Sequence, residues 1–191
     1  PLEYLHQHKK SVVTQRELYT DTRSYEAALR AALREAPDVI LLGEMRDAET
    51  IKAAVTAAET GHLVISTLHT IGAANTVDRI VDTFPPEQQR QIRTQLALAL
   101  EGVVSQQLLA AEGGTLIPAF EVMTVTPAVR NMIRESKAFQ LDSVISTSGA
   151  LGMITMDQSI LELVRGGRVS RDTALRHASN PDWLEKRLSS L

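Results

Sequence analysis

The sequence predicts an α/β fold, with a mostly parallel sheet flanked by helices and followed by a small all-helical region. Two observations support this prediction. Short apolar runs alternate with helical patterns over the first part of the chain, which is typical of parallel sheets. After Met123 the strand patterns stop, and Gly and Pro separate several short helical patterns. We therefore expect an α/β domain over residues 1–124 and a helical subdomain over 125–191.

The first strand–helix–strand unit is predicted over residues 24–69. Ser24 is a suitable N-cap for a helix that runs to about residue 36, where Pro37 ends it. The apolar run 39–42 follows, and its length and composition indicate a strand buried on both faces. Asp47 then caps an Ala-rich helix through about residue 60, and a second buried strand begins at residue 63.

The remaining elements follow from the same kinds of signal. An apolar stripe predicts a helix that ends before Phe84, and Pro86 begins a longer one. Two further strands are plausible at 103–109 and 116–123. A helix begins at Thr126-Pro127, and short helices are predicted at about 139–146, 155–165, 171–178 and 181–189.

Composition excludes several classes of protein. The 191 residues are 43% apolar and 23% charged, which are values of a globular domain. The absence of Cys excludes disulfides, thiolate catalysis and Cys-based zinc sites. A net charge of −3 argues against a nucleic-acid partner, and no apolar run is long enough for a transmembrane segment. The first residue is Pro rather than Met, so we expect a segment of a longer protein.

Two polar residues follow predicted strands of the sheet. Glu44 comes after the run 39–42, and His69 comes after the run that begins at residue 63. Ligands of open parallel sheets bind beyond the carboxyl ends of the strands, so both residues are candidates for a binding or catalytic site. The alternative is that both are solvated residues at strand ends. A metal site for His62 and His69 is not supported, because their spacing along one strand places them on opposite faces.

Three ordered segments resemble one known family. Residues 33–47 (LREAPDVILLGEMRD) and 57–70 (AAETGHLVISTLHT) are similar to the Walker B region and the His box of the secretion ATPase superfamily, which powers type II secretion and type IV pili. Residues 1–4 (PLEY) are similar to the end of its acidic box. The resemblance implies a RecA-like fold. A small departure is Ser66, where the family commonly has Gly.

Two features resemble the retraction (twitching-motility, PilT-type) branch of this superfamily. The link 110–115 (AAEGGT) contains no four-Cys zinc module, which assembly and type II secretion ATPases usually carry there. Residues 128–135 (AVRNMIRE) are similar to a motif of retraction motors, and 152–159 (GMITMDQS) also resembles that branch.

The resemblance implies roles for particular residues, with ATP and Mg²⁺ as cofactors. Glu44 would be the Walker B glutamate, which polarises water or orders Mg²⁺. No protein side chain would bind the Mg²⁺ directly, and the ion would enter with ATP near Glu44. Glu3 would be a second catalytic carboxylate, and His69 would lie near the γ-phosphate and sense its loss. The implied sensing set is completed by His62 and Arg46, and the implied retraction motif comprises Arg130, Asn131, Arg134 and Glu135.

Each implied role has a structural alternative. Glu3 lies near the start of the chain and need not be ordered there, and His62 follows a Gly, so it need only continue a helix cap. Arg130 and Arg134 are four residues apart and therefore lie on one helix face. A basic face that is simply solvated would show the same spacing.

The resemblance also implies partners. The parent protein would form a homohexameric ring at the cytoplasmic face of the inner membrane, where it would act on a platform protein to drive pilus retraction. The phosphate-binding pattern Gly-x-x-x-x-Gly-Lys-[ST] occurs nowhere in the sequence and is expected upstream, so we expect these residues alone to be inactive. The alternatives are an assembly or type II secretion ATPase without its zinc module, or a non-hydrolysing regulatory paralogue.

Overall fold

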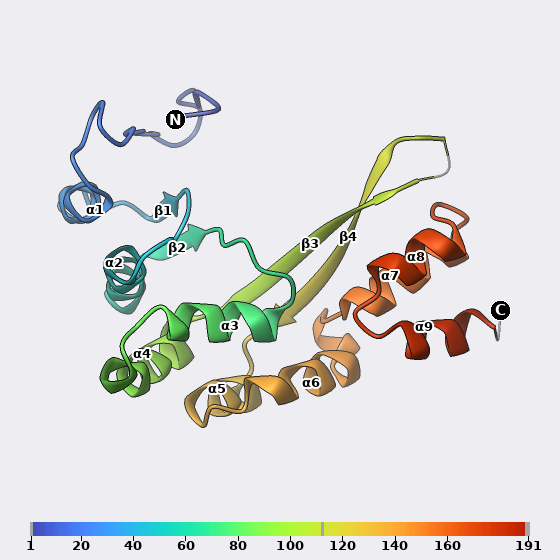
Figure 1. Ribbon diagram of the computed structural model, residues 1–191. Helices are drawn as coiled ribbons and strands as arrows, with labels where there is room; N and C mark the ends of the chain where they lie inside the picture. Colours follow the sequence, from blue (N-terminus) through green and yellow to red (C-terminus); the bar gives the residue numbers. More distant parts are fainter. Residues whose placement is uncertain (1, 112, 190–191) are drawn as a thin grey trace. The chain divides into compact units, whose positions relative to one another are not determined.

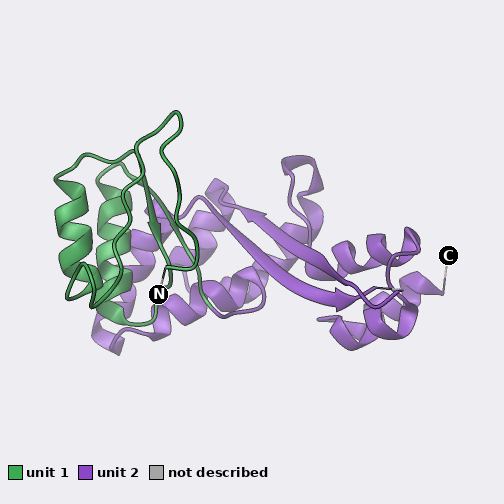
Figure 2. Cartoon of the chain, turned by 90° about the horizontal axis from the view of Figure 1, so that it is seen from above, with its two compact units in different colours: residues 1–68 green, residues 69–191 purple. Residues whose placement is uncertain are grey.

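The computed structural model describes residues 2–111 and 113–189. Its chain divides into two compact units, Pro1–Leu68 and His69–Leu191, which Figure 2 distinguishes by colour. Pro1, in the segment similar to the acidic box, and Glu112, in the link 110–115, lie outside the described residues. The domain boundary expected near residue 124 falls within the second unit and stays a prediction.

The first unit contains a parallel strand–helix–strand arrangement. Helix α1 (Tyr25–Leu33) precedes β1 (Val39–Leu42), α2 (Ala48–Glu59) and β2 (Leu63–Ser66), as Figure 1 shows. Both helices begin at the predicted caps, because the side chains of Ser24 and Asp47 accept backbone hydrogen bonds from the first turns. Strand β1 pairs with β2 in parallel, so the predicted α/β fold is confirmed here.

The two strands are buried on one face only. Ile40 and Leu42 of β1 are buried, and Ile40 packs with Leu29 of α1 and Ala57 of α2 in a small core. Val39 and Leu41 are more than half exposed. The expectation that this strand is buried on both faces is therefore wrong, because the helices of the unit contribute their apolar residues to a single face of a two-stranded sheet.

The second unit is organised around a long hairpin. Helices α3 (Ala73–Asp82) and α4 (Pro86–Ala99) precede β3 (Gly102–Ala110) and β4 (Leu116–Thr124), which pair antiparallel from Gly102 opposite Thr124 to Ala110 opposite Leu116. The link 111–115 is too short for the crossover that a parallel pair needs, so these strands form a separate antiparallel sheet.

The predicted short helices after the hairpin are confirmed. They are α5 (Pro127–Arg134), the 3₁₀ turn η1 (Ala138–Gln140), α6 (Leu141–Thr147), the 3₁₀ turn η2 (Gly149–Leu151), α7 (Met156–Arg165), α8 (Arg171–His177) and α9 (Pro181–Leu188). Before α7, Ile154 forms an isolated antiparallel bridge with Val122 of β4. This bridge attaches the start of α7 to the hairpin.

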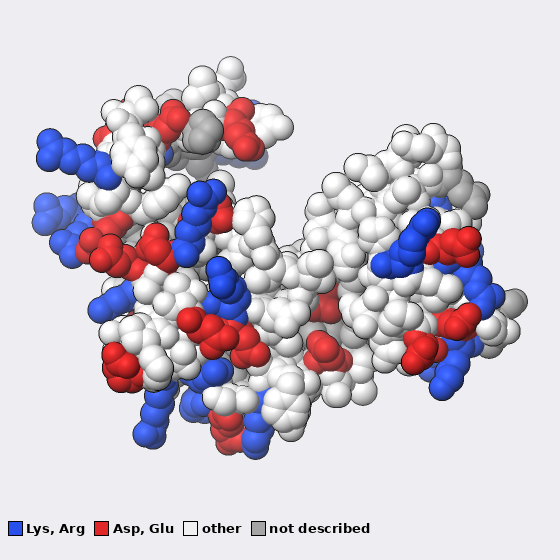
Figure 3. Space-filling model, in the orientation of Figure 1, with Lys and Arg blue, Asp and Glu red and all other residues white. Residues whose placement is uncertain are grey.

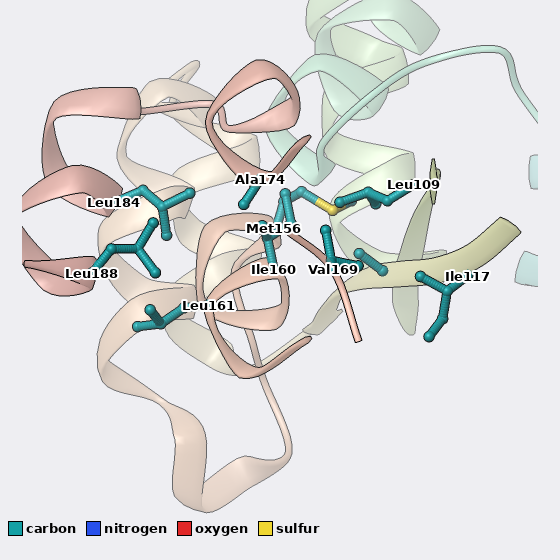
Figure 4. Packing of buried hydrophobic residues seen from close by; sticks show 10 residues of the cluster. Leu109, Ile117, Met156, Ile160, Leu161, Val169, Ala174, Leu184 and Leu188 are labelled. Atoms are coloured by element: carbon teal, nitrogen blue, oxygen red, sulfur yellow. The ribbon is translucent and has the colours of Figure 1, made fainter. Parts of the chain in front are cut away.

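Two groups of helices pack within the second unit. Helices α3, α4, α5 and α6 pack against one another through residues that are fully or almost fully buried. Helices α7 and α8 pack on the hairpin and α9 packs on these two helices. Figure 4 shows the buried residues of this cluster: Leu109, Ile117, Ala119, Met156, Ile160, Leu161, Val169, Ala174, Leu184 and Leu188. The hairpin therefore supports the helices that follow it.

Figure 3 shows the charged side chains on one face of the molecule. Acidic and basic residues are interspersed on the face that Figure 3 shows, which fits the small net charge. Within the described ranges 2–111 and 113–189, none of the helices has both the length and the apolar character that crossing a membrane would require.

Neighbouring leucines of β3 allow a matched test of this packing. We expect Leu109→Ala to lower the free energy of unfolding by about 2–5 kcal/mol, because it leaves a cavity in the cluster of Figure 4. Leu108→Ala is the control, since Leu108 is 48% exposed. Urea unfolding followed by circular dichroism measures both, and equal losses would contradict the described register.

Candidate functional site

The candidate site begins at the carboxyl end of β1, where Glu44 follows Gly43. The main-chain pairing of β1 and β2 continues past the strands, because the Met45 amide donates to the Thr67 carbonyl at 3.1 Å. The Thr67 hydroxyl also donates to the Gly43 carbonyl at 2.6 Å. These two bonds hold the Glu44 turn against the end of β2, which is the edge where parallel sheets bind ligands.

Glu44 forms a close ion pair with Arg46. The Arg46 Nε donates to Glu44 Oε2 at 2.7 Å, while the Glu44 side chain is 21% exposed and that of Arg46 is 75% exposed. This hydrogen bond and the carboxylate charge raise the pKa of Arg46 above its ordinary value. The structure thus brings two of the predicted site residues together, with the carboxylate partly shielded and the guanidinium on the surface.

Ser66, the residue that departs from the family pattern, ends β2. It lies opposite Leu42 in the ladder, one residue before the Thr67 that holds the Glu44 turn. Among the described residues its hydroxyl is one of the buried side-chain atoms without a hydrogen-bond partner. The departure therefore adds a polar atom near the candidate edge without disturbing the strand pairing.

His62 lies at the other edge of this sheet. It precedes Leu63, which pairs with Val39 at the start of β1, so the length of the strands separates His62 from the Glu44 turn. Its Nδ1 lies 3.1 Å from the Ala57 carbonyl and 3.3 Å from the Thr60 hydroxyl, at the end of α2. The structure therefore places His62 at a helix end, and its predicted part in nucleotide sensing stays a prediction.

The remaining predicted catalytic residues are on the surface. Glu3 is exposed in the irregular segment that precedes α1. His69 is exposed at the start of the second unit, four residues before Ala73, the first residue of α3. Their predicted roles also stay predictions.

Sequence reasoning missed a buried carboxylate in β4. Glu121 is 6% exposed and lies opposite Ser105 in the hairpin. Its Oε1 accepts a hydrogen bond from the Ala73 amide at 2.7 Å, and its Oε2 accepts one from the Met156 amide at 3.3 Å. The alternation of β4 was a usable signal, because it places Glu121 on the same face as the buried Ala119 and Met123.

Burial dominates the electrostatics of Glu121. Removal of the carboxylate from water raises its pKa above the ordinary value, and the amides of Ala73 and Met156 act in the opposite direction. Each of these amides belongs to the first residue of a helix, so the partial positive ends of α3 and α7 both face this one side chain.

The predicted retraction-motif residues lie on α5 and at its C-cap, and Arg130 contacts the preceding helix. Its Nη1 donates to the carbonyls of Ala97 and Leu98 at 2.8 and 2.7 Å, and its Nη2 donates to Glu101 at 2.9 Å. Arg130 therefore satisfies carbonyls at the end of α4 and places a positive charge at that helix terminus, which is stabilising.

The other motif residues are exposed at the end of α5. Asn131 donates to Glu135 at 3.2 Å, and Lys137 donates to the same carboxylate at 2.6 Å. These contacts lower the pKa of Glu135, and the hydrogen bond from Lys137 has the largest effect. Arg134 is exposed on the same helix. The structure thus gives Arg130 a packing role and leaves the end of the motif on the surface.

The fold and the candidate site define a class of protein: an α/β protein with a glutamate at the carboxyl end of a parallel strand pair, followed by a hairpin and helices. Comparison with known proteins gives the family. A family model described as "Type II/IV secretion system protein" matches residues 1–114, and the chain belongs to this family.

Relatives named for pilus retraction or twitching match nearly the whole chain. The type IV pilus retraction ATPase PilT of Pseudomonas aeruginosa is 51% identical over 182 residues, covering 95% of this chain and 53% of the relative. The twitching motility protein of Neisseria gonorrhoeae is 53% identical over 183 residues, covering 95% of this chain and 49% of the relative. The predicted resemblance is confirmed, and the chain spans about half the length of the curated relatives it matches.

A solved structure shows the same fold. The crystal structure of the pilus retraction motor PilT with bound ADP superposes with a TM-score of 0.88 at 47% identity, covering 97% of this chain and 52% of that one. In contrast, a pilus assembly ATPase PilB of Pseudomonas aeruginosa is 44% identical over 84 residues, which cover 44% of this chain and 14% of the relative.

The two motif arginines of α5 allow a direct test of their structural roles. We expect Arg130→Ala to lower the free energy of unfolding by about 1–3 kcal/mol, because it leaves the carbonyls at the end of α4 without their donor. Arg134→Ala should change it by about 0.5 kcal/mol or less, since Arg134 is exposed. Urea unfolding measures both variants, and an Arg134 loss as large as that of Arg130 would contradict this assignment.

Proposed function

We propose that the chain is part of an ATP-hydrolysing motor subunit that drives type IV pilus retraction and twitching motility. The observation that carries the proposal is the position of Glu44, a partly shielded carboxylate held at the carboxyl end of the parallel β1–β2 pair. The extent of the match to retraction ATPases supports the particular motor, because the assembly ATPase matches less than half of the chain.

In this proposal Glu44 acts on the water that attacks the terminal phosphate of ATP. Its Oε2 accepts the hydrogen bond of Arg46, which orients the carboxylate for accepting a proton. Glu3 is the proposed second carboxylate, and His69, His62 and Arg46 form the proposed sensing set. We assign His62 an indirect part through the end of α2, since it contacts the Ala57 carbonyl.

ATP and Mg²⁺ are the proposed cofactors, and the described residues fit one side of their site. Residues 2–111 and 113–189 contain no cluster of three or more His, Cys, Asp or Glu side chains able to hold a metal. Mg²⁺ usually keeps several waters and takes further ligands from the substrate phosphates, so an ion bound with ATP near Glu44 needs no such cluster. The related motor of known structure contains ADP, which supports nucleotide binding.

The proposed partners are further copies of the subunit in a hexameric ring and an inner-membrane platform protein of the pilus. The proposed location is the cytoplasmic face of the inner membrane, with peripheral attachment. Support comes from the relatives named for retraction and twitching. We assign the mechanical part of this proposal to the exposed end of α5, which carries Asn131, Arg134 and Glu135.

A chimera tests this function with an intact nucleotide site. In it, this chain replaces the matching part of the Pseudomonas aeruginosa PilT, and we expect ATP hydrolysis and rescue of twitching in a strain without that protein. Glu44→Gln should lower kcat by about 10²–10⁴-fold, because general-base assistance is lost. Glu49→Gln, at an exposed position in the first turn of α2, is the control. An inactive chimera, or equal effects of both variants, would refute the proposal.

The isolated 191 residues should behave differently. They lack the pattern Gly-x-x-x-x-Gly-Lys-[ST], whose backbone amides and Lys bind the phosphates. We therefore expect weak ATP binding by calorimetry and negligible phosphate release by the purified chain. Turnover at the rate of the chimera would show that these residues hydrolyse ATP without that loop.

A further inference from the structure

The strand pair Ser105–Glu121 holds two consecutive backbone amides at the start of α3. Ser105 Oγ accepts from the Gly72 amide at 2.9 Å, and Glu121 Oε1 accepts from the Ala73 amide at 2.7 Å. Gly72 has a φ of +88°, and a Cβ there would lie 3.6 Å from Glu121 Oε1. The chain therefore turns into α3 close against this carboxylate, in a conformation that glycine adopts readily.

The same carboxylate holds the start of a second helix. Glu121 Oε2 accepts from the amide of Met156, the first residue of α7. Helix α7 already has a complete capping box, in which Thr155 and Gln158 satisfy each other's amides. That box satisfies the amides of Thr155 and Gln158 and leaves the Met156 amide to Glu121, so one carboxylate completes the start of α7 and also holds the start of α3.

Only three residues separate His69 from Ala73. A residue spans at most about 3.6 Å of extended chain, so fixing the amides of Gly72 and Ala73 restricts where His69 can lie. A second contact tightens the segment, because the Thr70 hydroxyl lies 2.8 Å from that of Thr76 in α3. These contacts limit how far the His69 segment can shift relative to Ser105 and Glu121.

We propose that Glu121, assisted by Ser105, is a positioning residue that fixes the His69 segment and links it to α7. This inference rests on the proposed function, in which His69 senses the terminal phosphate. Helices α7, α8 and α9 share one core with the hairpin, so a change at His69 is passed through one side chain to the C-terminal helices.

The chain contains a matched control. Asp157 is 8% exposed and, like Glu121, accepts two backbone amide hydrogen bonds, from Ser179 at 2.7 Å and Asn180 at 2.8 Å. These amides lie at the start of α9 rather than beside His69. Asp157→Asn therefore removes a comparable buried charge without touching the His69 segment.

Amide hydrogen exchange of the purified chain is the first test. Glu121→Gln keeps one acceptor oxygen and turns an NH₂ group toward the second amide. We expect exchange at Ala73 or Met156 to become about ten-fold faster or more, since a buried hydrogen bond is lost. Asp157→Asn should make amide exchange at Ser179 and Asn180 faster and leave exchange at Ala73 unchanged. Unchanged exchange at both Ala73 and Met156 in Glu121→Gln would overturn the proposal.

ATP hydrolysis by the chimera is the second test. We expect Glu121→Gln to lower kcat by about ten-fold, because His69 is misplaced, with KM for ATP within about two-fold. Ser105→Ala, a milder change, should have a smaller effect in the same direction. Asp157→Asn should leave kcat within about two-fold of the unsubstituted chimera. Equal losses of kcat in Glu121→Gln and Asp157→Asn would show a structural role only and overturn the proposal.

The two tests separate the inference from the function on which it rests. If the unsubstituted chimera does not hydrolyse ATP, the proposed function fails, while hydrogen exchange still decides whether Glu121 fixes the segment. If Glu121→Gln does not fold, Ser105→Ala takes its place: faster exchange at Gly72 together with a lower kcat supports the proposal, and unchanged values overturn it.

Discussion

The parallel pairing of β1 with β2 is the constraint on which the candidate site depends. A parallel pair requires a crossover connection, and α2 forms this crossover. The N-cap of α2 is Asp47, three residues after Glu44. The ladder continues past the strands through Thr67, so the turn that carries Glu44 cannot move independently of β2. A carboxylate held in this way is pre-organised, which is what a catalytic base needs.

The second unit follows a different principle, because a hairpin rather than a helix organises it. One face of β3 and β4 packs against α7 and α8, and the same face carries the polar pair Ser105 and Glu121. A buried carboxylate is tolerated there because two helix N-termini donate to it. The hairpin thus combines apolar packing with one polar connection between helices that are far apart in the sequence.

The family resemblance and the structure inform different parts of the proposed mechanism. The motif around Glu44 and the family model indicate the family, and the extent of the match supports the proposed retraction motor. The structure separates the residues of each motif by role: His62 is at a helix end, Arg130 satisfies the end of α4, and Arg134 is on the surface. Residues of one sequence motif therefore need not share one function.

The sequence by itself determined the elements, because caps, prolines and apolar periodicity are local signals. Ser24, Asp47, Thr126 and Asn180 begin helices where predicted, and Glu44 follows its strand. Only the tertiary structure decided that Val39 and Leu41 are exposed, that the later strands pair antiparallel and that Glu121 joins two helices. These features depend on contacts between residues distant in the sequence, and local patterns of side chains do not specify them.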